Sequence, residues 1–289
     1  MADRTPDQRY AERVKAHIRE GRGKGTGSAY RPWLTVRTRG LNSNTWRPYG
    51  KSGRAHHLLS GVEMGIFCLL DMSHLVTDIR EQFPLLPLED TRRIASDLGC
   101  AHPRACPFMD KRLGKVDVVM TTDLLVDVAD LPDLPPNVAI SVKKASDLEQ
   151  TTPRKLANLL NKAEIERRYW AERGVPFLLV TDEDVPGPVR RNVDLLHRYV
   201  SLKGMRLPAP VGELADHLLD LLQAAPGLAV SAHGEVFDRS MGLARGSGTS
   251  LAWHCLATGA WAADLTRTLE AGLPIHELRR GLGSPEVSR

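Results

Sequence analysis

The sequence predicts an α/β domain, in which helices flank a sheet, followed by a smaller helical domain. Three observations lead to this prediction. The length of 289 residues suffices for two domains. As far as Asp184, apolar strand-like runs alternate with amphipathic helical segments. Beyond it the segments become short helices, separated by the proline-rich breaks 186–188 and 208–210. We therefore expect domains over 1–183 and 184–289.

The N-terminal segment carries most of the positive charge. Residues 1–57 hold thirteen Lys and Arg against four Asp and Glu, a surplus of nine, whereas the rest of the chain sums to minus five. Such a concentration suits a polyanion such as nucleic acid, and it equally suits a solvated basic arm. Residues 10–20 predict a basic helix. The run GRGKGTGS at 21–28 predicts either a cradle for DNA phosphates or a flexible linker, because glycines let backbone N–H groups approach an anion.

Two short motifs in this segment mix aromatic side chains with arginine, Tyr-Arg-Pro-Trp at 30–33 and Trp-Arg-Pro-Tyr at 46–49. Both motifs suit DNA contact or packing against the next domain, and the sequence does not decide between them. The side chains that we expect to contact DNA are Arg22, Lys24, Arg54, His56 and His57. For the two histidines, packing inside the protein is the alternative.

Apolar periodicity predicts the remaining elements of the first domain. A helix is expected to begin at Ser60, because Val62, Ile66 and Leu69 lie on one helical face. Glu63 follows Ser60 at the spacing of a capping box, so its carboxylate either caps this helix or takes part in chemistry. Runs rich in β-branched and apolar residues predict strands over 76–86, 116–128, 138–145 and 175–180. Amphipathic runs predict helices over 90–98 and 153–173.

The second domain is predicted to be all-α. Its helices are expected over 189–199, 212–224, 231–243 and 250–256. Thr249 is expected to cap the last of them. Helix, turn and helix, followed by a stretch that contains Gly and Trp, fit a winged-helix module, and many small helical bundles fit equally well.

Metal-dependent cleavage of a phosphodiester bond needs carboxylates to hold a cation and a lysine to offset developing charge. The chain offers Glu63, an acid within 117–127, and then Ser141-Val142-Lys143. Side chains alternate between the faces of a strand, so Ser141 and Lys143 share one face. Asp123 is flanked by apolar residues, and a buried carboxylate needs a partner or a metal. The sequence leaves open whether Asp123 binds a metal or forms a structural salt bridge with Lys143.

Several long strings resemble the TnsA family, the endonuclease subunits of heteromeric Tns-type cut-and-paste transposases. The strings are REGRGKGTGSAYRPWLTV at 19–36, SGRAHHLLSGVE at 52–63, VTDIREQFPLLP at 76–87, MTTDLLVD at 120–127 and EIERRYW at 164–170. They span most of residues 19–184 in the family's order, whereas the C-terminal third matches only in its helical layout. The resemblance implies a restriction-endonuclease-like fold, with a mixed sheet flanked by helices, for the first domain.

The resemblance also implies the site. It makes Glu63, Asp123 and Lys143 the catalytic residues, with Mg²⁺ as the cofactor and Mn²⁺ as its substitute. The metal ligands would be Glu63, Asp123, Ser141 and the backbone carbonyl of Val142. Where this fold usually has Gln or an acid, the chain has Ser141, and a short neutral hydroxyl is a poorer Mg²⁺ ligand. This departure bears on the number of metals and on their affinity.

The role implied by the resemblance is cleavage at the 5′ ends of a transposon, while a TnsB-type transposase cuts and joins the 3′ ends. The second domain would engage a TnsC-type ATPase regulator, with some DNA contact. An adaptor without catalytic activity, bridging TnsB and TnsC on DNA, is the alternative that Ser141 suggests. A third reading is a winged-helix transcription regulator with an appended domain, which leaves the acids and lysine unexplained.

The composition also bears on the compartment. No apolar run reaches the roughly 18 residues of a membrane span, so we expect no membrane partner. The first residues lack the apolar core of a signal peptide, and the four cysteines are scattered as in a reduced protein. We therefore expect a cytoplasmic bacterial protein associated with the nucleoid.

Overall fold

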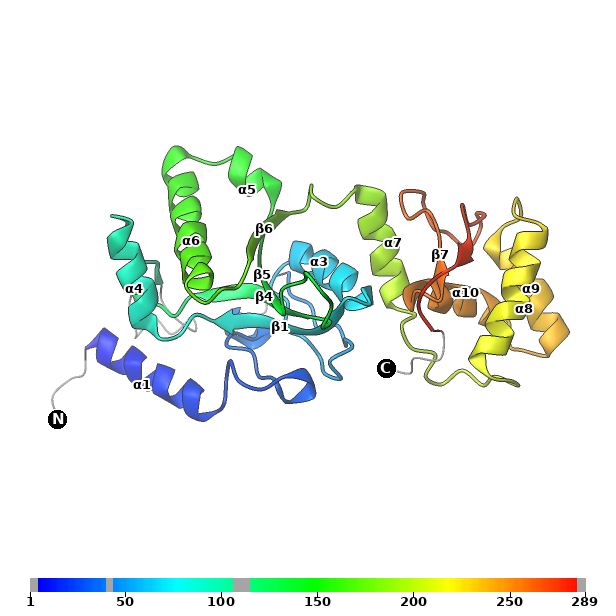
Figure 1. The fold of residues 1–289 in the computed structure, drawn as a ribbon, viewed down its shortest axis with the longest axis horizontal. Helices are drawn as coiled ribbons and strands as arrows, with labels where there is room; N and C mark the ends of the chain where they lie inside the picture. Colours follow the sequence, from blue (N-terminus) through cyan, green and yellow to red (C-terminus); the bar gives the residue numbers. More distant parts are fainter. Residues whose placement is uncertain (1–4, 40–43, 106–114, 285–289) are drawn as a thin grey trace. The chain divides into compact units, whose positions relative to one another are not determined.

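The structure, a computed structural model, describes residues 5–39, 44–105 and 115–284 (Figure 1). The chain forms two compact units, which we call the N-terminal unit (1–67 and 75–184) and the C-terminal unit (68–74 and 185–289). The second unit thus includes a segment that the sequence analysis assigned to the first. Met72 packs against the core of the C-terminal unit, and the Asp71 carboxylate lies 3.0 Å from Nε2 of His197.

The N-terminal unit is built on a mixed four-stranded sheet flanked by helices, which confirms the predicted α/β class and fits a restriction-endonuclease-like domain. The strands are β1 (Val76–Pro84), β4 (Thr121–Val128), β5 (Asn137–Lys143) and β6 (Phe177–Thr181), in the order β1-β4-β5-β6. The first two pairings are antiparallel and the last is parallel.

The strand predicted over 116–128 is divided in two. A short β3 (Val116–Asp117) pairs with β2 (Arg104–Ala105) in a separate sheet, and β4 begins only at Thr121. The backbone between them bonds elsewhere, because the Val119 N–H donates to the Tyr10 hydroxyl and the Met120 carbonyl accepts from the Leu85 N–H.

The helices of this unit are α1 (Pro6–Arg19), α2 (Val36–Arg39), α4 (Leu88–Asp97), α5 (Ala145–Glu149), α6 (Pro153–Ala171) and the first part of α3 (Gly61–Met72). Helix α6 connects the parallel strands β5 and β6, as a crossover must. Figure 1 shows α4 and α6 side by side. Their apolar faces form a core with the sheet, to which Leu85, Ile94, Leu125, Ile165 and Trp170 belong.

The described part of the basic N-terminal segment is folded onto the sheet, so of the two alternatives left open by its charge, the solvated arm is wrong for this part. Tyr10 in α1, Tyr30 and Trp33 are all buried. The glycine-rich run is ordered as well, and it contains the short 3-10 helix η1 (Gly27–Ala29). The Gly27 N–H donates to the Asp78 carboxylate of β1 over 2.7 Å.

The C-terminal unit contains α7 (Gly187–His197), α8 (Val211–Ala224), α9 (Val230–Met241), α10 (Ser247–Ala257) and a two-stranded sheet of β7 (Trp261–Ala262) and β8 (Arg279–Arg280). The prediction of an all-α domain is therefore corrected, since Trp261 anchors this small sheet in the core. The winged-helix arrangement stays a prediction. Helix α10 begins at Ser247, before the predicted cap Thr249, because the Asp238 carboxylate accepts from the N–H groups of Gly246 and Gly248.

Helix α10 is the central element of this unit. Its residues from Leu251 to Ala257 are buried, and it packs against α7, α8, α9 and β7. Among the residues that the structure describes, no helix is long and apolar enough to cross a membrane.

Candidate active site

Asp123, Ser141, Val142 and Lys143 meet where β4 and β5 run side by side. The Lys143 ammonium donates to the Asp123 carboxylate over 3.0 Å and to the Ser141 hydroxyl over 3.1 Å. The Val142 N–H donates to the same carboxylate oxygen, Oδ2, over 2.7 Å. The structure therefore brings Asp123 together with Ser141 and Lys143, the two residues that strand alternation placed on one face.

Charges in this cluster reinforce one another. Burial alone would raise the pKa of Asp123, but Lys143, Lys162 and the Val142 amide outweigh it and lower that pKa. Burial alone would lower the pKa of Lys143, but Asp123 and Glu166 outweigh it and raise that pKa. At neutral pH the pair is an ion pair, whose side chains are 21% (Lys143) and 16% (Asp123) exposed. The cluster is thus mostly buried but still accessible from solvent.

Glu63 lies in the first turn of α3, where it caps the helix, and its part in the chemistry stays a prediction. Its Oε2 accepts from the Leu59 N–H over 2.9 Å, and its own N–H donates to the Ser60 hydroxyl. These bonds form a helix cap, displaced by one residue from the expected capping box. Burial and the charge of Asp123 raise the pKa of Glu63 to about 7. The carboxyl is therefore both a cap and a neighbour of the Asp123 cluster.

Gln82 is a site residue that the sequence analysis missed. Its side-chain amide donates to Glu63 Oε2 over 3.3 Å and accepts from the Thr121 hydroxyl over 3.2 Å. The residue is 2% exposed and has a φ of 49°, in the left-handed region that non-glycine residues avoid. Gln82 thus links α3 to the start of β4. The sequence of residues 76–86 does not single out Gln82, because that run contains several polar residues.

Glu166 on α6 was also missed, because charges on a long helix usually face solvent. It is 1% exposed, and its Oε1 has no hydrogen-bond partner among the described residues. Burial, followed by the charge of Asp123, raises the pKa of Glu166 to about 7, against the opposing charges of Lys162 and Lys143. A buried carboxyl with an unsatisfied oxygen is typical of a functional site.

The donors of this site suit a hard divalent cation. They are carboxylate, hydroxyl and backbone carbonyl oxygens, which Mg²⁺ prefers to nitrogen or sulfur. The Lys143 ammonium contacts the Val142 carbonyl over 2.7 Å as well as Asp123, so these oxygens already hold a positive charge. Among the described residues, no group of three or more His, Cys, Asp or Glu lies close enough to hold a metal by itself. A cation would therefore be held by two acids together with neutral oxygens.

Arg54 and His56 both pair with the buried carboxylate of Glu81. The Arg54 guanidinium forms two hydrogen bonds with the Glu81 carboxylate, at 2.8 and 2.6 Å, and two more with the carbonyls of Ile79 and Gly27. His56 is 1% exposed, and its Nδ1 lies 2.8 Å from Glu81. The packing alternative is therefore confirmed for His56, whereas Arg54 is paired within the unit and DNA contact by it stays a prediction.

The other residues expected to contact DNA lie nearer the surface. Lys24 is exposed in the glycine-rich run, and Arg22 is held by Glu20 and by the Trp33 carbonyl. His57 is half-buried, and its Nδ1 accepts from the Val36 N–H. Burial lowers the pKa of His57. DNA contact by these three residues stays a prediction.

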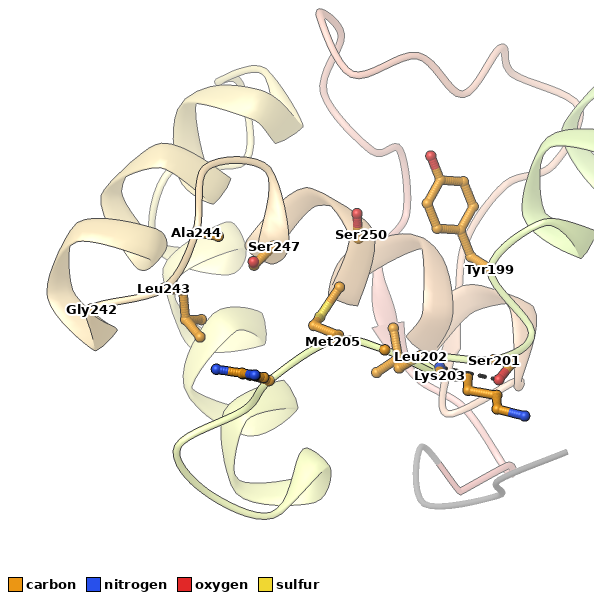
Figure 2. Close-up of a pocket in the computed structure, with 12 residues that line it drawn as sticks. Tyr199, Ser201, Leu202, Lys203, Met205, Gly242, Leu243, Ala244, Ser247 and Ser250 are labelled. Atoms are coloured by element: carbon orange, nitrogen blue, oxygen red, sulfur yellow. Dashed lines mark hydrogen bonds between the residues drawn. The ribbon is translucent and has the colours of Figure 1, made fainter.

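The C-terminal unit has a cavity of about 660 Å³ with another chemistry (Figure 2). Hydroxyls of Ser247 and Ser250 from α10 line it, together with Lys203 and Arg206 from the segment after α7. No Asp, Glu, His or Cys is among its lining residues. The cavity therefore lacks the carboxylates, imidazoles and thiols that usually hold metals, and the candidate active site is the cluster around Asp123.

Comparisons with known proteins point the same way as the site. Residues 73–182 match the model of the TnsA-like endonuclease N-terminal domain, and residues 184–265 match that of the TnsA endonuclease C-terminal domain. The chain is 42% identical over 185 residues to the transposon Tn7 transposition protein TnsA of Escherichia coli. That match covers 64% of this chain and 62% of the length of the curated relative. Asp123 and Lys143 lie inside the matched N-terminal domain, and Glu63 precedes it.

Proposed function

The chain belongs to the TnsA family, and on that premise we propose that it is the DNA endonuclease subunit of a Tn7-like cut-and-paste transposase. The observation that carries the proposal is the contact of Lys143 with Asp123 and the Val142 carbonyl, beside Glu63. Two acids and a lysine on adjacent elements are what metal-dependent phosphodiester hydrolysis needs. The reaction is hydrolysis of one DNA strand at a transposon end.

Each residue of the site is proposed to have a separate role in the reaction. Glu63, Asp123, the Ser141 hydroxyl and the Val142 carbonyl would hold Mg²⁺, which when bound would polarise the phosphate and acidify water. Mn²⁺ takes the same oxygen donors. Lys143 orients the attacking water and offsets the charge that develops on the phosphate. Glu166, with a pKa near 7 and an unpaired oxygen, accepts a proton or a hydrogen bond from that water.

We further propose that this chain cleaves the 5′ ends of the element while a TnsB-type subunit cuts and joins the 3′ ends. The C-terminal unit is proposed to be winged-helix-like and to engage a TnsC-type ATPase. Because α10 is buried within its own unit, it offers no face to a major groove. This burial favours protein binding over sequence reading by that helix.

A catalytically silent adaptor is the second candidate function. Ser141 favours it, because its short hydroxyl bonds Asp123 and Lys143 where a carboxylate or amide would be a better metal ligand. The adaptor would keep DNA and partner binding but would not cleave.

The test is strand cleavage of transposon-end DNA by the reconstituted complex with Mg²⁺. Asp123→Ala is expected to abolish 5′-strand cleavage, whereas Asp117→Ala keeps it, since Asp117 forms a surface pair with Arg92. Both variants should assemble equally with the other subunits. Undiminished 5′-strand cleavage by Asp123→Ala would show that another subunit does the chemistry, and would leave the adaptor function standing.

A further inference from the structure

The two motifs that mix aromatics with arginine share a central Arg-Pro, with the flanking tyrosine and tryptophan exchanged, but they differ in environment. Tyr30 and Trp33 of the first motif are 3% and 1% exposed, so that motif is part of the core. Trp46 and Tyr49 of the second are 44% and 59% exposed. The first motif therefore packs, and the second presents two large aromatic side chains to solvent.

The segment that carries the exposed motif is ordered in spite of its exposure. Backbone hydrogen bonds join Trp46 to Leu58 in both directions, at 2.9 and 3.1 Å, and the His56 N–H donates to the Pro48 carbonyl over 2.8 Å. The Tyr49 hydroxyl donates to the Gly53 carbonyl. We call residues 46–58 the aromatic hairpin. Its returning half carries Arg54, whose bonds to Glu81 fix it to the sheet.

The aromatic hairpin leads directly into the candidate active site. Leu59 follows it, and the Leu59 N–H donates to the Glu63 carboxylate. A side chain built at Gly61 would lie 3.9 Å from Nε1 of Trp46, so the indole lies beside the first turn of α3. That turn carries Glu63. Trp46 thus lies beside the helix turn that carries the acid of the proposed reaction.

Charge favours DNA as the occupant of this face. Arg47, between the aromatics, is exposed and has no hydrogen bond or ion pair within the described ranges. The surrounding segment 1–57 has a surplus of nine positive charges. A second copy of the chain would bring the same positive charge, whereas a nucleic acid brings phosphates for arginine and bases for aromatic stacking.

We propose that the aromatic hairpin is a DNA-contact site, at which Trp46 stacks on a base near the cleaved bond while Arg47 pairs with a phosphate. The inference rests on the proposed function, because the DNA that would contact the hairpin is the substrate of the proposed nuclease site. It adds a surface that positions the strand, apart from the groups that cleave it. Tyr49 supplies a second aromatic face on the same hairpin.

Tryptophan fluorescence tests this site directly, because the other four of the five tryptophans, at 33, 170, 253 and 261, are buried. The full chain is titrated with a duplex that carries a transposon end and its flank. Binding is expected to quench the emission, and Trp46→Phe is expected to bind similarly without this response. Trp46→Ala should weaken binding about 5- to 150-fold, the range for loss of one stacked base. Arg47→Ala should lower the salt slope by about 1.

Leu131→Ala is the matched control, since Leu131 is 45% exposed and lies outside the hairpin. It is expected to leave binding unchanged. Emission that stays constant up to high DNA concentration, or a Trp46→Phe variant that responds as the parent does, overturns the proposal. A Trp46-dependent response to a partner protein without DNA overturns it too, in favour of a protein interface.

Asp123→Ala separates this inference from the proposed function. If that variant cleaves normally while Trp46 still reports DNA, the nuclease assignment fails and the contact site stands. If Asp123→Ala loses cleavage and Trp46 does not respond, the contact site fails and the nuclease assignment stands.

Discussion

The N-terminal unit holds two buried carboxyl groups in opposite electrostatic states. Glu81 on β1 is fully buried and accepts hydrogen bonds from Arg54 and from the His57 N–H, with His56 2.8 Å away. Burial would raise the pKa of Glu81, but His56 and Arg54 outweigh it and lower the pKa to about 2. Glu166 on α6 is equally buried, yet one of its oxygens has no partner among the described residues and its pKa is raised to about 7.

The difference shows that burial alone does not tell a structural acid from a chemical one. A carboxylate surrounded by donors is stabilised as an ion and has no capacity left for a ligand. A carboxylate short of donors has free lone pairs, which a cation, water or proton can use. The number of donors around each acid therefore separates the scaffold from the site, and each cluster predicts a different kind of mutational effect.

The largest expected effect is on stability, at the Glu81 cluster. Glu81→Ala leaves the buried Arg54 guanidinium without its partner, and loss of one member of a buried ion pair costs about 3–5 kcal/mol. Urea unfolding of the full chain measures this change. Arg80→Ala, which removes the more exposed pair with Asp127, is the control and should cost much less. Similar costs for the two variants would mean that the buried cluster is not structural.

The next effect is on catalysis, at Lys143. Lys143→Met is expected to slow single-turnover strand cleavage about 10²- to 10³-fold, the range for one group that stabilises transition-state charge. Its neighbour Lys144 is exposed and lies on the opposite face of the chain, so Lys144→Met should cleave at nearly the normal rate. Equal cleavage rates for the two variants would show that the lysine at position 143 has no specific role in cleavage.

Glu166 and Glu81 should also make the free energy of unfolding of the metal-free protein depend on pH in opposite directions. The pKa of Glu166 is raised, so its contribution is present below its ordinary pKa of 4.5 and is lost as pH rises through about 7. The pKa of Glu81 is lowered, so its contribution is present above 4.5 and is lost as pH falls through about 2.

Glu166→Gln isolates the high-pH arm of this dependence. The variant has no carboxyl to ionise, so at pH 8 with chelator it should be about 3 kcal/mol more stable than the parent. Near pH 4.5 the two proteins should be similar. Denaturant midpoints measured from pH 4.5 to 8 check this, and a constant difference across that range would show that Glu166 does not titrate there.

Sequence patterns predicted most of the sheet and the pairing at its centre. Alternation placed Ser141 and Lys143 on one face, because it follows from strand geometry alone, and the apolar neighbours of Asp123 singled out that acid. Glu166 could not be predicted, because its burial depends on how α6 lies on the sheet. The division at residues 118–120 depends on Tyr10, more than a hundred residues earlier, whose hydroxyl takes the Val119 N–H. Such long-range contacts leave no local signal.

The smallest expected effect is at Gln82. This residue follows the structural acid Glu81 in the sequence and donates a hydrogen bond to Glu63 of the candidate site. Gln82→Ala removes the amide that donates to Glu63, which should cost about 1 kcal/mol. Gln82→Gly removes the same amide but tolerates the φ of 49° without strain, so it should be about 1 kcal/mol more stable than the alanine variant. Urea unfolding of both variants measures the two contributions separately. If alanine is the more stable of the two, the left-handed backbone at Gln82 carries no strain, and its amide alone accounts for the residue.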